Sequence, residues 1–142
     1  MFSRSFAFAF TALTALCVAT AAPALASQTV SNAETAKAYR MDAARHIYAS
    51  YPTKIYKGKL PPLVHAIVVL EVDVDGTGKL RNLHMIRVPT HAPDVTAAVR
   101  TMIEQTHLPA PVRMADGAKF TEVWLVDKSG RFQLDALTEG QR

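Results

Sequence analysis

The sequence predicts an α+β domain in which two helices pack on an antiparallel sheet of three strands, with a short fourth strand as an option near the C-terminus. Three observations lead to this prediction. The chain has 142 residues, of which 49% are hydrophobic and 20% charged, which is enough for one modest core. Two segments carry apolar residues at helical spacing, and three carry them at alternate positions. Their order is helix, strand, strand, helix, strand, and helices combined with an antiparallel hairpin are typical of the α+β class.

Residues 1–26 have the pattern of a secretory signal peptide, so we expect residues 27–142 to form the single folded domain. Arg4 supplies the positive start, residues 6–22 carry no charge, and Ala24-Leu25-Ala26 presents small residues to a signal peptidase. The alternative is an uncleaved anchor, but 17 uncharged residues are at the short end of what spans a bilayer about 30 Å thick. Cys17 is the only cysteine and lies in this segment, so the processed chain forms no disulfide. We therefore expect a periplasmic protein without a stable membrane anchor.

The first helix is expected from Ala33 to about Tyr51. Ser31 and Glu34 have the spacing of a capping box, and Pro52 ends the helical pattern. The apolar stripe of this helix consists of Met41, Ala44, Ile47, Tyr48 and Tyr51. The loop that follows, residues 52–62, is basic through Lys54, Lys57 and Lys59. We interpret these lysines as a solvated surface, with contact to an anionic partner as the alternative.

Residues 63–88 predict a β-hairpin. Apolar residues alternate up to Asp75, Gly76–Gly78 form a three-residue loop, and residues 79–88 return as the second strand. The predicted register pairs Val74 with Leu80, Leu70 with His84 and Val68 with Ile86. This register places four apolar residues on the face away from the valine row, namely Ile67, Val69, Leu83 and Met85. If both helices cover the valine face, these four form an exposed second interface for a partner or a homodimer; if the first helix covers them, they belong to the core.

The rest of the chain predicts a second helix and one or two further strands. Residues 94–107 carry a full helical stripe, formed by Val95, Ala98, Val99, Met102 and Ile103. A proline-rich exit at residues 108–111 stops this helix. Residues 119–127 then read as a strand rich in aromatic and branched side chains, a tight turn follows at residues 127–130, and residues 131–137 form the optional fourth strand.

The sequence argues against several classes of function. From a net charge of +4 without any run of like charge, we expect neither a nucleic-acid groove nor a polybasic membrane patch. The spacing of Glu71, Asp73 and Asp75 imitates a calcium loop, but position twelve is Asn82 instead of the glutamate that such a loop needs. The five histidines form no spaced metal-binding pair on one helix, and no serine lies in a nucleophile elbow. We therefore expect a protein that is not an enzyme and binds no metal and no cofactor.

Several pieces of the sequence together resemble the C-terminal domain of the TonB and TolA energy-transducer superfamily. These pieces are Tyr51-Pro52, the valine-rich strand ending in Asp75-Gly76, the returning strand 79–88, the helix with Ala97-Ala98-Val99, the proline-rich exit 108–111, Gly117 and the last strand. The resemblance covers residues 51 to about 126, and it implies a periplasmic, non-enzymatic module for transport. In that superfamily an extended segment of an outer-membrane receptor adds as a strand beside the last strand of the sheet, a mode known as β-augmentation.

By position, the docking strand implied by the resemblance is Phe120, Thr121, Glu122, Val123, Trp124, Leu125 and Val126. For Trp124 itself, packing in the core is the more ordinary role of an aromatic residue on an apolar strand. Two departures limit the resemblance. The superfamily's transducers have an uncleaved membrane helix and a long spacer where this sequence shows a cleavable signal, and residues 131–137 can fold back onto the docking edge.

We therefore expect a periplasmic protein-binding module that contacts envelope proteins, outer-membrane receptors among them, by strand addition. The alternative is a structural or accessory subunit, self-associating or not, whose sheet edge is filled by its own C-terminal strand.

Overall fold

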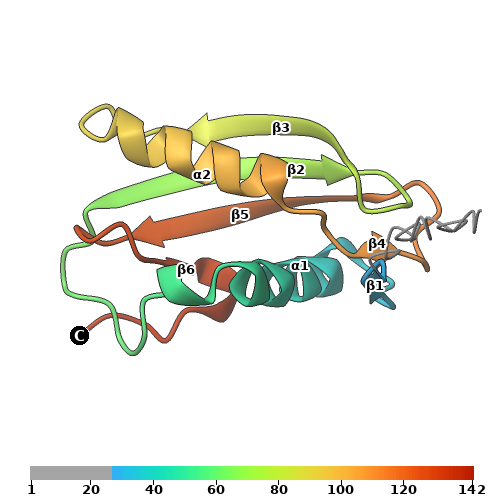
Figure 1. Ribbon diagram of the computed structural model, residues 1–142, viewed down its shortest axis with the longest axis horizontal. Helices are drawn as coiled ribbons and strands as arrows, with labels where there is room; N and C mark the ends of the chain where they lie inside the picture. Colours follow the sequence, from blue (N-terminus) through green and yellow to red (C-terminus); the bar gives the residue numbers. More distant parts are fainter. Residues whose placement is uncertain (1–26) are drawn as a thin grey trace, which may run out of the picture.

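The computed structural model describes residues 27–142, and the predicted signal peptide lies outside the described residues. An antiparallel sheet has the strand order β3-β2-β5-β6, formed by β2 (Ala66–Val74), β3 (Leu80–Arg87), β5 (Ala118–Val126) and β6 (Phe132–Leu134). Helices α1 (Ala36–Ser50) and α2 (Pro93–Gln105) both lie on one face of this sheet (Figure 1). A small parallel pair joins β1 (Val30–Ser31) to β4 (Ala110–Pro111), and 3-10 turns lie at Pro52–Lys54 and Asp135–Leu137. The predicted α+β class is confirmed, with the fourth strand present.

Helix α1 begins later than the sequence predicts. Its N-cap is Thr35, whose side-chain oxygen accepts a hydrogen bond from the Ala38 amide at 3.2 Å. The predicted capping box of Ser31 and Glu34 is wrong, because Ser31 belongs to β1 and its hydroxyl donates to Asp42 at 2.6 Å. Glu34 instead forms an ion pair with Arg113 at 2.8 Å. The parallel pairing with β4 keeps Val30 and Ser31 in a strand, so Ser31 cannot serve as the helix cap.

Helix α2 lies close to its predicted position and packs over β2 and β3 (Figure 1). Pro93 occupies the first turn, where a missing amide costs no helical hydrogen bond, and Asp94 places a negative charge beside the free amides. Val95, Val99 and Ile103 are buried from successive turns, as their spacing predicts. Neither described helix is long and apolar enough to cross a membrane.

The core lies between the two helices and the valine face of the sheet. Val68, Leu70, Val72 and Val74 are fully buried, and Trp124 fills the centre of β5. The ring centroids of Trp124 and Phe132 on β6 are 4.4 Å apart, and the rings of Tyr39 and Phe120 meet edge-on with their centroids 5.6 Å apart. The core role expected of Trp124 is therefore confirmed.

The register of β3 differs from the prediction because the hairpin contains β-bulges. Val74 pairs with Leu80 as predicted, but the next pair is Asp73 with Asn82, so Arg81 is an extra residue. Beyond this bulge Leu83 lies opposite Val72, and Met85 lies opposite Leu70. A shift of one residue moves every later side chain to the other face of the sheet. The predicted pairing of Leu70 with His84 is therefore wrong.

The side chain of Arg81 explains why the bulge is stable. One of its terminal nitrogens donates to the carbonyl of Val74 at 2.9 Å and to the carbonyl of Asp116. The Nε atom lies 3.4 Å from the Asp73 carboxylate. Arg81 thus holds three neighbouring segments together from a position that an unbroken strand would not give it.

Candidate functional site

The predicted docking strand lies between β2 and β6 in the sheet, but β6 covers only part of its outer side. Residues 120–126 of β5 pair with β2 along their whole length, and Trp124–Val126 pair on the other side with β6. The alternation predicted for the strand is present, since Phe120, Glu122, Trp124 and Val126 are buried while Thr121 is exposed and Val123 and Leu125 are half-buried. The expectation of a free edge is wrong for Trp124–Val126, because the optional fourth strand forms and occupies their outer side.

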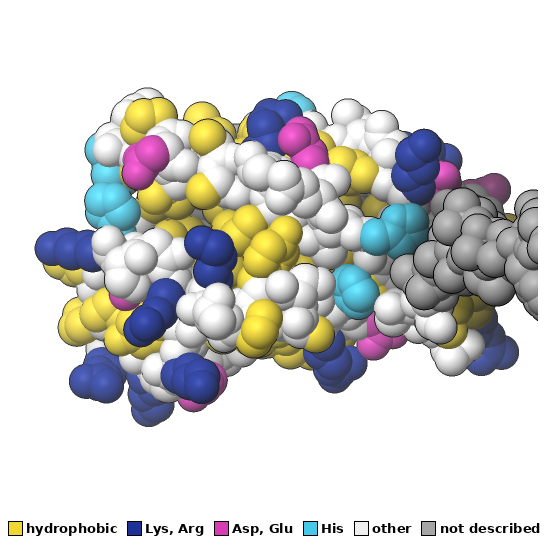
Figure 2. Space-filling view, viewed as in Figure 1, with side chains coloured by type: hydrophobic (Ala, Val, Ile, Leu, Met, Phe, Trp, Pro, Cys, Tyr) yellow, Lys and Arg dark blue, Asp and Glu magenta, His cyan; other side chains and the backbone are white. Residues whose placement is uncertain are grey.

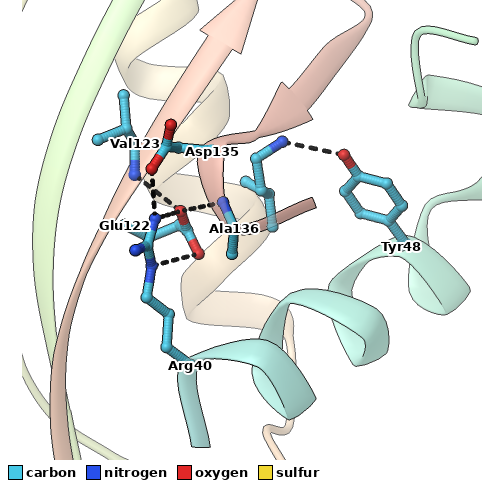
Figure 3. Close-up of polar contacts among 7 residues, drawn as sticks. Arg40, Tyr48, Glu122, Val123, Asp135 and Ala136 are labelled. Atoms are coloured by element: carbon cyan, nitrogen blue, oxygen red, sulfur yellow. Dashed lines mark hydrogen bonds and ion pairs between the residues drawn. The ribbon is translucent and has the colours of Figure 1, made fainter. Parts of the chain in front are cut away.

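Where β6 ends, the side chain of Glu122 takes the place of a partner strand. The residue is 1% exposed, and one carboxylate oxygen accepts hydrogen bonds from the amides of Val123 at 3.0 Å and Ala136 at 3.4 Å (Figure 3). Arg40 of α1 donates to the same carboxylate through two nitrogens, at 2.8 and 3.2 Å. The hydrogen bond to Glu122 raises the pKa of Arg40, with a smaller contribution from Asp135. A buried carboxylate and its arginine therefore close β5 just beyond the last pair with β6.

The outer side of β6 is closed by two other segments of the chain. Ile55 forms a parallel bridge to Phe132, and the Tyr56 amide donates to the carbonyl of Phe132 at 2.9 Å. The side chain of Gln133, 1% exposed, donates to the carbonyls of Tyr56 and Gly58 at 2.9 and 2.7 Å. Its oxygen accepts from the C-terminal tail, which a bridge between Leu60 and Gln141 holds against the loop. On this side of the sheet, strand β6 therefore covers Trp124–Val126 of β5, and no strand among residues 27–142 pairs with the outer side of Ala118–Thr121.

Strand β3 forms the open edge of the sheet. It pairs with β2 on one side, and no other strand among residues 27–142 pairs with it on the other. In an antiparallel ladder alternate residues direct their N–H and C=O groups away from the partner strand, so an edge strand presents a row of free donors and acceptors. Ile86, at the second bulge, is 52% exposed. The sequence analysis named Leu83 and Met85 of this strand as interface residues, but it did not identify the backbone edge of the strand as a binding candidate.

The predicted second interface is split by the β3 bulge. Leu83 and Met85 pack against the core beside Val72 and Leu70, so they do not share a face with Ile67 and Val69. Both helices lie on the core face, so within residues 27–142 no helix covers the other face of the sheet. On that uncovered face Ile67 pairs with Leu125, and Val69 pairs with Val123, all four being half-buried. The partners of Ile67 and Val69 thus come from β5 and not from β3.

The residues considered for metal or acid–base chemistry are separated or paired with cations. Within the described part of the chain, no three His, Cys, Asp or Glu side chains cluster as metal ligands. His91 hydrogen-bonds the backbone carbonyl of His65 at 2.7 Å. Glu71 and Asp73 are each 3.4 Å from a cation, Lys119 and Arg81 respectively. Asp75 caps its own turn, and the hydrogen bonds from Thr77 lower its pKa.

Comparisons with known proteins give no relative: no protein-family model, no curated protein and no solved structure matches this chain.

Proposed function

We propose that this chain is an exported, non-enzymatic binding module that takes an extended segment of another envelope protein as an added strand. The observation that carries the proposal is the open edge of β3, eight residues long, in a sheet whose opposite side is covered at Trp124–Val126 by β6. Unpaired strand edges bind other chains readily, and proteins usually cover them when they serve no purpose. The resemblance to transducer C-terminal domains supports the same mode of binding, here at β3 instead of β5.

The charge of β3 supports a particular kind of partner segment. Residues 79–88 contain Lys79, Arg81, His84 and Arg87 and no carboxylate. Arg87 forms no ion pair with any described residue, so its charge is available to a partner. A segment with acidic side chains would meet Lys79 and Arg87 while its backbone pairs with the strand. Outer-membrane receptors remain the partner class that the resemblance implies.

A second function is supported by the closure of β6. The C-terminal strand fills the outer side of Trp124–Val126, which is the arrangement expected of a structural or accessory subunit. In that case the protein would act through its folded surface as a whole, and strand addition at β3 would play no part.

Photocrosslinking in cells tests the proposal. A photoreactive residue placed at Ile86 should capture a partner protein, and mass spectrometry should locate the crosslink in one extended segment of it. The control position is Thr121, which is exposed on β5. If only the Thr121 position captures a partner, the docking strand is β5 and not β3. If both positions give crosslinks only within the chain, the accessory subunit is favoured.

A pair of variants separates backbone pairing from side-chain contact. Ile86 has no partner residue in β2, because the register passes from Leu70 with Met85 to Val69 with Arg87. Ile86→Pro therefore removes a backbone amide of β3 without breaking a residue pair with β2, and proline is tolerated at bulges of edge strands. Ile86→Ala keeps the amide and loses the side chain. We expect the proline variant to lose partner affinity at least tenfold and the alanine variant to lose much less; equal losses would contradict strand addition.

A further inference from the structure

One end of the molecule gathers cations from two segments that are far apart in the sequence. The loop 52–63 and the turn 127–131 meet there: Lys57 and Arg131 line one shallow pocket, and Leu63 and Lys128 line another. The bridge between Ile55 and Phe132 fixes the two segments to each other. In Figure 2 dark blue side chains gather at the left and lower left of the molecule, the end where Figure 1 shows the C-terminus. We call residues 52–63 and 127–131 the basic end.

The basic end carries the net charge of the described chain. It holds five exposed cations and one carboxylate, that of Asp127, whereas residues 27–142 outside it hold ten cations and eleven carboxylates. Asp127 accepts hydrogen bonds from the amides of Ser129 and Arg131 at 3.0 Å each. Glu139 lies beside the basic end and accepts from the Gly58 amide, and Arg142 adds a cation nearby. None of the five cations forms an ion pair with a described residue; they are Lys54, Lys57, Lys59, Lys128 and Arg131.

An exposed leucine lies among these cations. Leu63 is 86% exposed, the highest value among the large hydrophobic side chains of the described chain, and it follows Pro61-Pro62. A single exposed leucine is ordinary by itself. An exposed apolar side chain beside cations, as Leu63 is beside Lys128, is the arrangement of proteins that rest on a membrane surface, where the apolar group enters the boundary of the acyl chains and the cations face the headgroups.

We propose that the basic end binds the surface of an anionic phospholipid bilayer, with Leu63 inserted and the five cations against the lipid phosphates. Four of the five are lysines, which act as point charges without the fixed geometry of a guanidinium. They are therefore suited to a diffuse anionic surface better than to one defined carboxylate. This binding is separate from strand addition at β3 and does not depend on it.

Vesicle co-sedimentation of the protein purified from expressing cells measures the partition coefficient. Vesicles of phosphatidylglycerol and phosphatidylcholine are compared with pure phosphatidylcholine, and any contribution of residues 1–26 is the same in every variant compared. The test variant is Lys54→Gln/Lys57→Gln/Lys59→Gln. The control, Lys37→Gln/Lys79→Gln/Arg87→Gln, removes the same charge from cations that lie outside the basic end and form no ion pair with a described residue.

We expect the test variant to lose about 100-fold in partition coefficient and the control to lose only a few-fold, because the attraction falls off within a Debye length of the surface. Binding of the unmodified protein should disappear in about 0.5 M salt. Equal losses in the two variants would overturn the proposal, since net charge alone would then explain binding.

Insertion of Leu63 has its own measurement. In Leu63→Trp the added indole should give a blue-shifted emission on anionic vesicles, while the buried Trp124 of the unmodified protein should not respond. Leu63→Ala should weaken binding by roughly 3- to 10-fold. No blue shift, together with displacement of the protein from vesicles by millimolar inorganic phosphate, would identify a site for soluble phosphate and refute membrane binding.

Discussion

The ion pair between Arg40 and Glu122 should contribute measurably to stability, because the Glu122 carboxylate is buried on β5 just beyond the last residue pair with β6. The Glu122 side chain is 2% exposed and that of Arg40 is 27% exposed. Removing one partner of a fully buried pair costs about 3–5 kcal/mol. Glu122 keeps two backbone donors and Arg40 is partly hydrated, so for Arg40→Met we expect a loss of about 2 kcal/mol in the free energy of unfolding.

A double-mutant cycle isolates the coupling of the two side chains. Glu122→Gln keeps an oxygen for the Val123 amide and removes the charge. In urea unfolding, we expect a coupling energy of about 1–2 kcal/mol between Arg40→Met and Glu122→Gln. Asp135→Asn is the control, because Asp135 pairs with the same arginine but is 53% exposed, and its coupling should stay below about 0.5 kcal/mol. A coupling for Glu122 as small as that for Asp135 would refute the assignment of Glu122 as the group that closes the strand.

Three further predictions concern the fold. Burial raises the pKa of Tyr39 above its unfolded value near 10, so the neutral side chain stabilises the fold fully below that pH and less as the pH rises further. In an alkaline titration followed by circular dichroism, Tyr39→Phe should therefore unfold at a higher pH than the unmodified protein. Gly78→Ala should lower the free energy of unfolding by several kcal/mol, because a Cβ there meets the Leu108 carbonyl. Gly130→Ala, which has a similar φ but open space around it, should lower it by only about 1 kcal/mol, and thermal melts measure both variants. Deleting residues 131–142 should abolish the cooperative unfolding transition, since β6 buries all three of its side chains, and a truncated chain that still melts cooperatively would contradict the closed edge.

The period of the apolar residues was sufficient to predict most of the fold. The stripe of α2 and the alternation of β2 and β5 follow from positions that are either buried or exposed, with little ambiguity. The three-residue loop after Asp75 was predicted as well, and the Gly130 turn repeats it: in both, the first Asp caps the loop and a glycine has a positive φ, 82° at Gly78 and 79° at Gly130.

The bulge at Arg81 was not predicted, because strict alternation leaves no place for an extra residue. A regular register would direct the polar Asn82 and His84 to the core face, whereas the extra residue places Leu83 and Met85 there. Arg81 holds this register through contacts with Val74, Asp73 and Asp116 that the sequence does not display. The error at the second interface follows directly, because Leu83 and Met85 were assigned to the wrong face.

The closed outer side of β5 depends on contacts between distant segments. The sequence left the fourth strand open as an option, and no local signal could show that Gln133 hydrogen-bonds the loop around Tyr56. Glu122 was predicted as part of a docking strand, whereas its carboxylate is satisfied within the molecule by a helix residue 82 positions away. The role of such a side chain can be recognised only when the position of its distant partner in the fold is known.

The strand pairing makes the molecule mechanically anisotropic. Nine consecutive residue pairs join β2 to β5, but only three join β5 to β6. A pull along β3 by a bound segment would load the central ladders lengthwise, and their hydrogen bonds, which run across the strands, would share the force. A pull on the C-terminus would instead peel β6 away one pair at a time. A tether or tag attached at the C-terminus therefore loads the three-pair ladder of β6, whereas traction at β3 would first load the six residue pairs that join β3 to β2.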